Sequence, residues 1–212
     1  MNKRLNYILM ADIIGSRKTN QQKLMKDFKS IAGKVDHDLR NQFLSPITIT
    51  LGDEFQSIPR DLSSALTVIL QLEEEIIKTK KNFKLRYVLV EGQIETPINS
   101  KIGYEMLGSG LTRARELLTQ SKKTKSRFNF SLKDESLGCA LTNSFVALRS
   151  IIDGWKPEKD YYIVAEFLQH ADYKKVALEL DKERSLMWKR EKSLKLEEYF
   201  ALKEVINYLG GE

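Results

Sequence analysis

YILMADIIGS, residues 7–16, is an apolar strand that ends on a carboxylate, Asp12. ITITLGDEF, residues 47–55, is a second strand, and Asp53 follows it in a turn. Strand ends and tight turns hold side chains rigidly, so these two aspartates can lie close together. Two such carboxylates repel each other unless a cation lies between them. We therefore expect Asp12 and Asp53 to share Mg²⁺ or Mn²⁺ with a triphosphate, as in nucleotidyl transfer.

The composition is that of an ordinary globular protein, with 212 residues of which 42% are apolar and 30% charged. The apolar run after MNKR is too short for a signal peptide, and no run approaches the roughly 20 residues of a membrane span. The single cysteine, Cys139, cannot form an internal disulfide, and we expect it to be a buried small side chain. These features predict a cytoplasmic protein with no membrane partner.

The formal net charge of +6 favours a polyanionic partner. Residues 156–212 contain 11 Lys and Arg against 12 Asp and Glu. The positive excess therefore lies in the first 155 residues, where the phosphates of a nucleotide could use it.

The first half of the chain alternates strands and helices. Residues 5–11 read as a buried strand, and the following apolar residues recur at helical spacing: Leu24, Phe28, Ile31, Val35, Leu39 and Phe43. We expect a helix over about 20–43 that Pro46 prevents from continuing, then a strand over 47–51. Gly52-Asp53 is a hairpin turn dipeptide, and residues 55–58 form the returning strand, closed by Pro59.

Asp61 is a suitable N-cap for a second helix that buries Leu62, Leu66, Ile69, Leu72, Ile76 and Ile77. Its acidic run, residues 73–75, is predicted to be an exposed helix face. A strand over 83–91 and a helix over 111–120 follow. The basic tract 121–127 is predicted to be a solvated loop, with phosphate binding as the minor alternative. A strand over 128–132 and a helix over 137–152 complete this part.

Trp155 to Glu158 is the expected domain boundary, which divides the chain into residues 1–155 and 156–212. Beyond it the pattern is helical throughout, with helices over 159–169, 173–180, 184–193 and 196–209. Short helices joined by turns of a few residues are typical of a helix-turn-helix tail.

The element order β-α-β-β-α-β predicts an α/β (α+β) fold of the ferredoxin-like palm type. In this arrangement the first strand and the hairpin are neighbours in the sheet. Asp12 and Asp53 are therefore expected to converge.

Residues 11–16 resemble the first metal motif of class III nucleotidyl cyclases, and residues 51–55 resemble the second, as well as the loop of diguanylate cyclases. Residues 85–92 resemble the cyclase strand that follows the second helix. The whole chain is similar to the SatD family, whose members join such a palm domain to a C-terminal helix-turn-helix. This resemblance implies the fold and a regulatory setting.

The resemblance implies a site as well. Asp12 and Asp53 would be carboxylate ligands of one or two Mg²⁺ ions, with the Ile13 carbonyl as a third ligand. The turn through Ile14, Gly15 and Ser16 would present N–H groups to a triphosphate, since glycine allows a close approach.

Three further residues complete the expected nucleotide site. Arg17 or Lys18 would add positive potential beside the next helix N-terminus. Glu54 is assigned to the nucleotide site, and its alternative is a solvated edge charge. The alternatives for the aspartates are a helix N-cap for Asp12 and a plain hairpin turn for Asp53.

The cyclase helix carries an asparagine and an arginine that orient the ribose and stabilise the transition state. The matching positions here hold Thr112 and Glu116. Catalysis therefore stays open: the chain is either an active nucleotidyl cyclase or nucleotidyltransferase, or a nucleotide-binding domain without turnover.

The tail offers a candidate DNA-recognition helix with four polar residues for phosphates or base edges: Arg184, Ser185, Lys189 and Arg190. The turn before it reads Asp181-Lys182-Glu183, without the usual glycine. The alternative is a helical clamp that dimerises or packs on the palm.

We expect a cytoplasmic regulator that responds to a nucleotide and a metal ion and binds DNA or another macromolecule through its tail. An active cyclase is the second interpretation, and a structural or dimerisation scaffold is the third. A homodimer is expected from the resemblance, because cyclase sites form between two palms.

Overall fold

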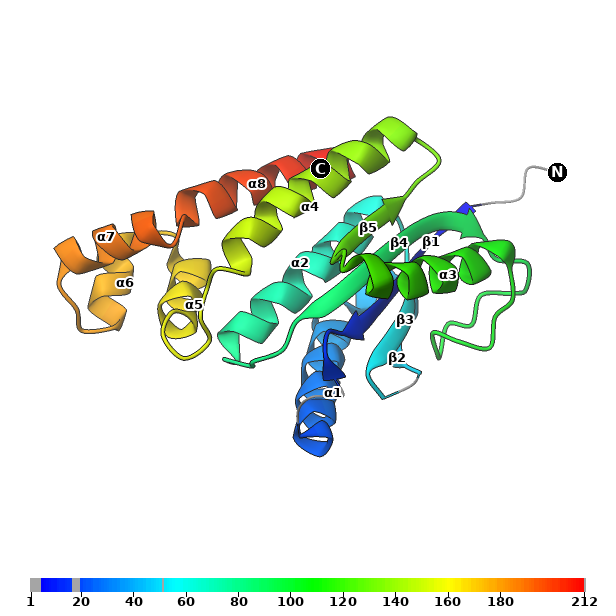
Figure 1. Cartoon of the computed structure of the whole chain (residues 1–212), viewed down its shortest axis with the longest axis horizontal. Helices are drawn as coiled ribbons and strands as arrows, with labels where there is room; N and C mark the ends of the chain where they lie inside the picture. The colour runs from blue at the N-terminus through cyan, green and yellow to red at the C-terminus, as the bar shows by residue number, and fades with distance from the viewer. Residues whose placement is uncertain (1–4, 17–19, 51, 212) are drawn as a thin grey trace.

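A computed structural model describes residues 5–16, 20–50 and 52–211. In this part of the chain, helices cover both faces of a five-stranded sheet (Figure 1). The elements in chain order are β1 (Leu5–Ile13), α1 (Gln21–Asp38), the 3₁₀ turn η2 (Arg40–Gln42), β2 (Phe43–Ile49), β3 (Glu54–Pro59), α2 (Leu62–Lys78), β4 (Leu85–Gln93), α3 (Ser109–Thr124), β5 (Phe128–Ser131), α4 (Glu135–Ile152), α5 (Tyr161–His170), α6 (Tyr173–Glu179), α7 (Arg184–Ser193) and α8 (Leu196–Gly210).

The sheet order is β2-β3-β1-β4-β5. Neighbouring strands are antiparallel, except for β4 and β5, which are parallel. The first four strands with α1 and α2 form the β-α-β-β-α-β unit, in which β1 lies between β3 and β4. The predicted α+β fold with a ferredoxin-like palm is confirmed.

Strand alternation in β1 separates two hydrophobic cores. Leu9, Ala11 and Ile13 belong to the large core that α1, α2 and α4 cover, whereas Ile8 and Met10 belong to a smaller core that includes α3 residues. Successive side chains of a strand point to opposite faces. Asp12 therefore shares the α3 face with Ile8 and Met10.

Side-chain caps define the start of the helices. Asn20 accepts a hydrogen bond of 3.2 Å from the Lys23 amide at the start of α1. Asp61 accepts one of 2.8 Å from the Ser64 amide and so caps α2, as predicted. The six apolar residues predicted to face inward from α2 are all buried.

The first helix is shorter than predicted. It ends at Asp38, and β2 begins at Phe43 and runs through Pro46. Proline is tolerated there because β2 is at the edge of the sheet, and because its pairing with β3 shifts register between Ser45 and Thr48, the interval that contains Pro46.

The prediction of a solvated basic loop over 121–127 is wrong. Its first half continues α3 to Thr124, and Lys125 ends the helix with a φ of 57°. Arg127 is buried, with its guanidinium paired to Glu73 and, at 2.6 Å, to Asp153. These ion pairs depend on residues far away in the sequence, which a local charge count cannot reveal.

The prediction of an exposed acidic face over 73–75 is also wrong, because all three glutamates are buried. Glu73 pairs with Arg127, Glu74 with Lys78 and Lys203, and Glu75 with Lys34. These glutamates lie in the C-terminal part of α2, and α2 contacts both α5 and α8, which cover a side that would be exposed in an isolated helix. Each buried carboxylate has a cationic partner, as burial of charge requires.

The tail packs on the palm. α5 and α8 contact α2, and α8 also lies along α4 (Figure 1). The Trp155 indole N–H donates a bond of 2.9 Å to the Leu194 carbonyl, so the expected boundary segment is itself anchored to the tail. One hydrophobic core contains residues from both sides of residue 155. The domain boundary at that position stays a prediction.

Two further observations concern the surface. Cys139 is exposed, on the outer side of α4, so the expectation that it is buried is wrong. Within residues 5–16, 20–50 and 52–211, no helix has the length and apolar composition needed to cross a bilayer.

Candidate functional site

The end of β1 and the hairpin turn before β3 meet, as predicted from the two motifs. The Ile13 amide donates a hydrogen bond of 2.9 Å to the Asp53 carbonyl. The Ser16 hydroxyl donates one of 2.6 Å to Asp53 Oδ2. Two segments that are distant in sequence are therefore joined by a backbone bond and a side-chain bond at one end of the sheet.

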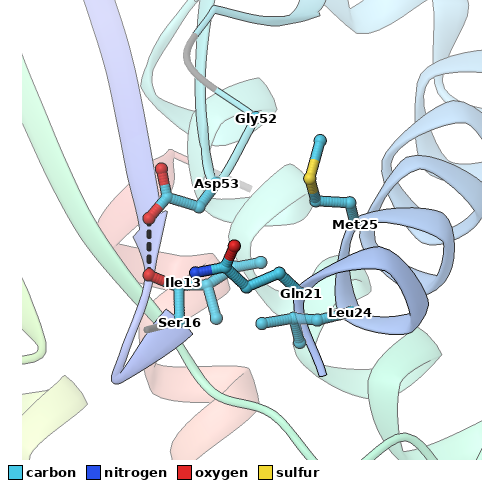
Figure 2. Close-up of a pocket in the computed structure, with 7 residues that line it drawn as sticks. All are labelled: Ile13, Ser16, Gln21, Leu24, Met25, Gly52 and Asp53. Carbon is cyan, nitrogen blue, oxygen red and sulfur yellow. Dashed lines mark hydrogen bonds between the residues drawn. The ribbon is translucent and has the colours of Figure 1, made fainter. Parts of the chain in front are cut away.

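A hollow of about 260 Å³ lies between these two turns and the first turn of α1 (Figure 2). Its lining consists of Ile13, Ser16, Gln21, Leu24, Met25, Gly52 and Asp53. Leu24 and Met25 provide an apolar wall, and the Ser16 hydroxyl, the Gln21 amide and the Asp53 carboxylate provide polar groups. Because the N-terminus of a helix has unpaired N–H groups and a partial positive charge, this hollow suits an anionic group.

Glycines give the two turns their shape. Gly15 has a φ of +75° and Gly52 a φ of +82°, a region that side-chain-bearing residues rarely adopt. A Cβ on Gly15 would meet nothing within 4 Å, so its requirement for glycine is conformational. The Ile14 amide donates to the Lys84 carbonyl at 2.9 Å, and this N–H is therefore engaged within the protein.

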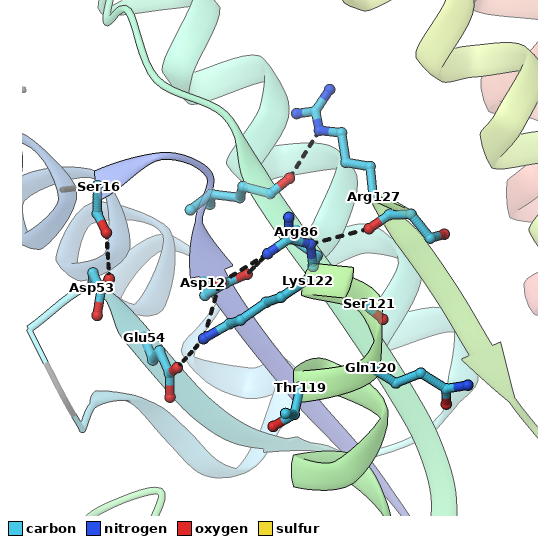
Figure 3. Close-up of polar contacts among 12 residues, drawn as sticks. Asp12, Ser16, Asp53, Glu54, Arg86, Thr119, Gln120, Ser121, Lys122 and Arg127 are labelled. Carbon is cyan, nitrogen blue, oxygen red and sulfur yellow. Dashed lines mark hydrogen bonds and ion pairs between the residues drawn. The ribbon is translucent and has the colours of Figure 1, made fainter. Parts of the chain in front are cut away.

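The expectation that the Asp12 and Asp53 carboxylates converge on a shared cation is wrong for this arrangement, because Asp12 lies on the opposite face of the sheet from Asp53. The two carboxylate oxygens of Asp12 accept hydrogen bonds of 3.1 and 3.0 Å from one guanidinium nitrogen of Arg86, the residue that pairs with Asp12 on β4 (Figure 3). Lys122 Nζ lies 3.3 Å from Asp12 Oδ2. Both Asp12 and Arg86 are buried.

Glu54 is the cross-strand partner of Asp12 and lies on the same face. Its Oε1 is 2.7 Å from Lys122 Nζ and its Oε2 is 2.6 Å from Arg115 Nη1. The side chain that shares a cation with Asp12 is therefore Glu54, while the Asp53 carboxylate bonds to Ser16. Strand alternation explains this, because Asp53 and Glu54 are consecutive residues and point in opposite directions.

Burial and charge act against each other in this cluster. Burial raises the pKa of Asp12 above its usual value, although Arg86 and Lys122 both act to lower it. Burial alone would lower the pKa of Lys122, but its hydrogen bond to Glu54 and the charges of Asp12 and Glu54 outweigh this, so the pKa is raised. Lys122 therefore stays protonated at neutral pH.

The fit to a divalent cation differs between the two aspartates. Asp53, with the neighbouring Ser16 hydroxyl and the Ile13 backbone, offers the hard oxygen donors that Mg²⁺ takes. Both oxygens of Asp12 instead face cationic nitrogens. In the described part of the chain, no three Asp, Glu, His or Cys residues are grouped so as to hold a metal ion.

Of the predicted nucleotide residues, Ile14, Gly15 and Ser16 form the turn beside the hollow, and Glu54 lies on the α3 face. Arg17 and Lys18 fall outside the described residues. Sequence reasoning missed the roles of Arg86, Arg115 and Lys122. Arg86 had a visible indication, because it is a charged residue within the apolar strand LRYVLV.

The predicted DNA-binding residues lie on α7. Arg184, Ser185 and Lys189 are exposed, and Met187 is the buried residue of this helix. Arg190 is half-buried and pairs with Asp160. Arg190 therefore holds the tail together in this arrangement, while the other three residues face outward.

The family model of the SatD family matches residues 7–209. No curated protein matches the chain. Solved structures that it resembles include a bacterial light-regulated adenylyl cyclase, with 13% identity and a TM-score of 0.44, over 61% of this chain and 77% of that one. The catalytic core of a rhodopsin-guanylyl cyclase in complex with ATPαS has 16% identity and a TM-score of 0.42, over 55% and 72%. The guanylyl cyclase Cya2 has 13% identity and a TM-score of 0.40, over 56% and 71%.

Proposed function

The chain belongs to the SatD family, and from the geometry of its palm we propose that it binds a nucleoside triphosphate at the hollow beside β1 and α1. One observation carries this proposal: the turn after β1, the turn before β3 and the start of α1 meet around a single hollow. Both turns also carry the sequence motifs that resemble those of nucleotidyl cyclases.

The phosphate end of the ligand fits this hollow best. The Ser16 hydroxyl and the Gln21 amide are polar groups at its wall, and the N-terminus of α1 adds positive potential. The apolar Leu24 and Met25 line the side toward α1. In this arrangement the base and ribose extend out of the hollow, which is too small for a whole nucleotide.

Mg²⁺ or Mn²⁺ is the cofactor that this proposal predicts, with the Asp53 carboxylate and the Ile13 carbonyl as protein ligands. When bound, such an ion neutralises part of the triphosphate charge. In the present arrangement Asp12 does not join it, because Arg86 and Lys122 occupy its carboxylate oxygens.

Thermal unfolding with ATP or GTP, with and without Mn²⁺, tests nucleotide binding. A ligand at about a hundred times its dissociation constant adds about 2.7 kcal/mol of stability, which raises Tm by several degrees. We expect this shift in the wild type and its loss in Asp53→Ala. Asp27→Ala, which removes a carboxylate of α1 that pairs with Lys81, serves as the control and should keep the shift. The absence of any shift in the wild type would exclude the proposal.

Binding without turnover is the form of the function that we favour over an active cyclase. Thr112 and Glu116 stand where the cyclases carry their catalytic asparagine and arginine, and both are exposed on α3. The test is incubation with labelled ATP or GTP and chromatography of the products. Recovery of the unchanged nucleotide is expected, and a cyclic nucleotide product would establish the cyclase.

DNA binding by the tail is the second part of the proposal, and the surface of α6 and α7 favours it. A hollow of about 380 Å³ there is lined by Lys174, Lys175, Ala177, Leu178, Asp181, Lys182 and Arg184, with four cations against one carboxylate. Arg184, which is part of this lining, is exposed, and so are Ser185 and Lys189 on the same helix, α7. Such a cluster suits the phosphates of a duplex.

The salt dependence of binding to random duplex DNA tests the tail. Arg184→Ala should weaken binding and reduce the slope of log K against log salt by about one. Lys159→Ala removes an exposed cation that does not line this hollow and is the control. Equal slopes for the wild type and Arg184→Ala would exclude this assignment. A homodimer and a cytoplasmic location complete the proposal as expectations.

A further inference from the structure

Every carboxylate oxygen of Asp12 and Glu54 has a cationic partner. Arg115 pairs with Oε2 of Glu54. Arg86 bonds to both oxygens of Asp12, and Lys122 lies between the two carboxylates (Figure 3). The Lys122 Nζ is 3.3 Å from Asp12 Oδ2 and 2.7 Å from Glu54 Oε1. A single ammonium thus bridges two carboxylates on adjacent strands.

The charges of this cluster favour the ammonium over a metal ion. Two carboxylates are matched with three cationic side chains, so the cluster already has a net positive charge. A divalent cation beside Lys122 and the buried Arg86 would add two more positive charges at short range. Without Lys122, Glu54 Oε1 would lose its cationic partner, and Asp12 Oδ2 would keep Arg86 alone.

We propose that Lys122 is the built-in cation of the Asp12–Glu54 pair and excludes divalent metal ions from it. Among the described residues, the proposed place for a divalent cation is then Asp53, and Lys122 is the residue that keeps a further ion from the Asp12–Glu54 pair. The ammonium also fastens the C-terminal half of α3 to the central strands, because Lys122 belongs to α3 and both carboxylates belong to the sheet.

Mn²⁺ binding to the nucleotide-free protein tests this directly, by titration followed with electron paramagnetic resonance. Lys122→Met removes the ammonium and keeps most of the side-chain volume. We expect a Mn²⁺ site that binds about tenfold or more tightly than any site of the wild type, because the repulsion by the ammonium is lost and Glu54 Oε1 and Asp12 Oδ2 no longer face it. Lys122→Arg keeps a cation and should bind Mn²⁺ as the wild type does.

Two controls assign the new site. Lys123→Met removes the same charge from the adjacent, exposed position of α3 and should leave Mn²⁺ binding unchanged. Asp12→Asn in the Lys122→Met background should abolish the gained site. Equal Mn²⁺ binding by the wild type and a folded Lys122→Met variant would overturn the proposal, as would a gain in Lys123→Met of the same size.

This inference does not depend on nucleotide binding. If the thermal shift with ATP and GTP is absent while Lys122→Met gains Mn²⁺, the proposed function fails and the role of Lys122 stands. If the thermal shift is present but Lys122→Met gains no Mn²⁺, the nucleotide proposal stands and the role of Lys122 fails. A variant that melts far below the wild type is replaced by Lys122→Gln, to which the same outcomes apply.

Discussion

The Tyr199 hydroxyl of α8 donates a hydrogen bond of 3.1 Å to Glu74 Oε1, about one turn before the end of α2. Both residues are buried, and Lys203, one turn further along α8, pairs with the same oxygen. The tail is thus tied to the palm by polar contacts within an apolar surrounding. Each such contact is costly to break, because the partner left behind stays out of reach of water.

Tyr199→Phe should lower the free energy of unfolding by about 1 to 2 kcal/mol, since Glu74 loses a buried donor while the ring packing is kept. Tyr208→Phe is the matched control on the same helix, and its side chain is exposed, so it should leave stability unchanged. Urea unfolding at neutral pH measures both. A Tyr199→Phe variant as stable as the wild type would show that the hydroxyl does not fasten the tail.

The free energy of unfolding should fall as the pH is lowered, partly because Glu74 becomes protonated. Burial by itself raises the pKa of Glu74, but the hydrogen bond and charge of Lys203, together with Lys78, outweigh it and hold the pKa below its ordinary 4.5. The pKa of Glu74 is lower in the folded protein than in the unfolded chain. Its contribution to the free energy of unfolding is therefore complete at a pH above the unfolded pKa, and it is lost as the pH falls through the folded pKa.

Glu74→Gln should therefore flatten the loss of stability between about pH 5 and pH 3, although it costs stability at neutral pH. Urea midpoints across this range measure the effect. Glu198→Gln, at an exposed position of α8, is the control. A Glu74→Gln variant with the wild-type pH dependence would contradict this role of Glu74.

Arg127→Met should destabilise the protein by about 3 to 5 kcal/mol, because it leaves Glu73 as an uncompensated buried charge. Arg149→Met is the matched control: Arg149 pairs with the same Asp153, but its side chain is 43% exposed, and the expected loss is below about 1 kcal/mol. Denaturant unfolding measures both variants. Glu73→Gln in the Arg127→Met background should recover part of the loss, and no recovery would mean that unpaired charge is not the cause.

Gly15→Ala should cost about 1 kcal/mol or more, because alanine is strained at the φ of this turn. Gly33→Ala, inside α1 with open space around its Cβ, should instead gain up to about 1 kcal/mol, since alanine favours a helix. Thermal unfolding measures both changes in stability, which should have opposite signs. With ATP or GTP present, Gly15→Ala should also show a smaller ligand-dependent shift than Gly33→Ala. Equal ligand-dependent shifts in the two variants would mean that the turn at Gly15 is not part of the ligand site.

Local pattern was enough for most of the fold. The N-cap at Asp61, the buried positions of α2 and the alternation of β1 all follow from neighbouring residues, and the palm topology follows from the order of the elements. The boundary of α1 was predicted less well, because Leu39 and Phe43 continue the helical spacing although the chain has already turned toward the edge strand β2.

Charged side chains were predicted least well, since their environment depends on partners from distant parts of the chain. Glu74 looks like an exposed residue until α8 covers it, and Lys203 is 129 residues away. Lys122 looks like a loop cation until α3 places it over β1 and β3.

The sequence by itself determined the order of strands and helices and brought the turns of Ile13 and Asp53 together. Only the tertiary structure decided which way each carboxylate points: Asp53 toward Ser16 and the hollow, and Asp12 toward Arg86 and Lys122 on the opposite face. The physical reason is that hydrophobic periodicity and turn chemistry are local, whereas the pairing of buried charges depends on the elements that fold over them.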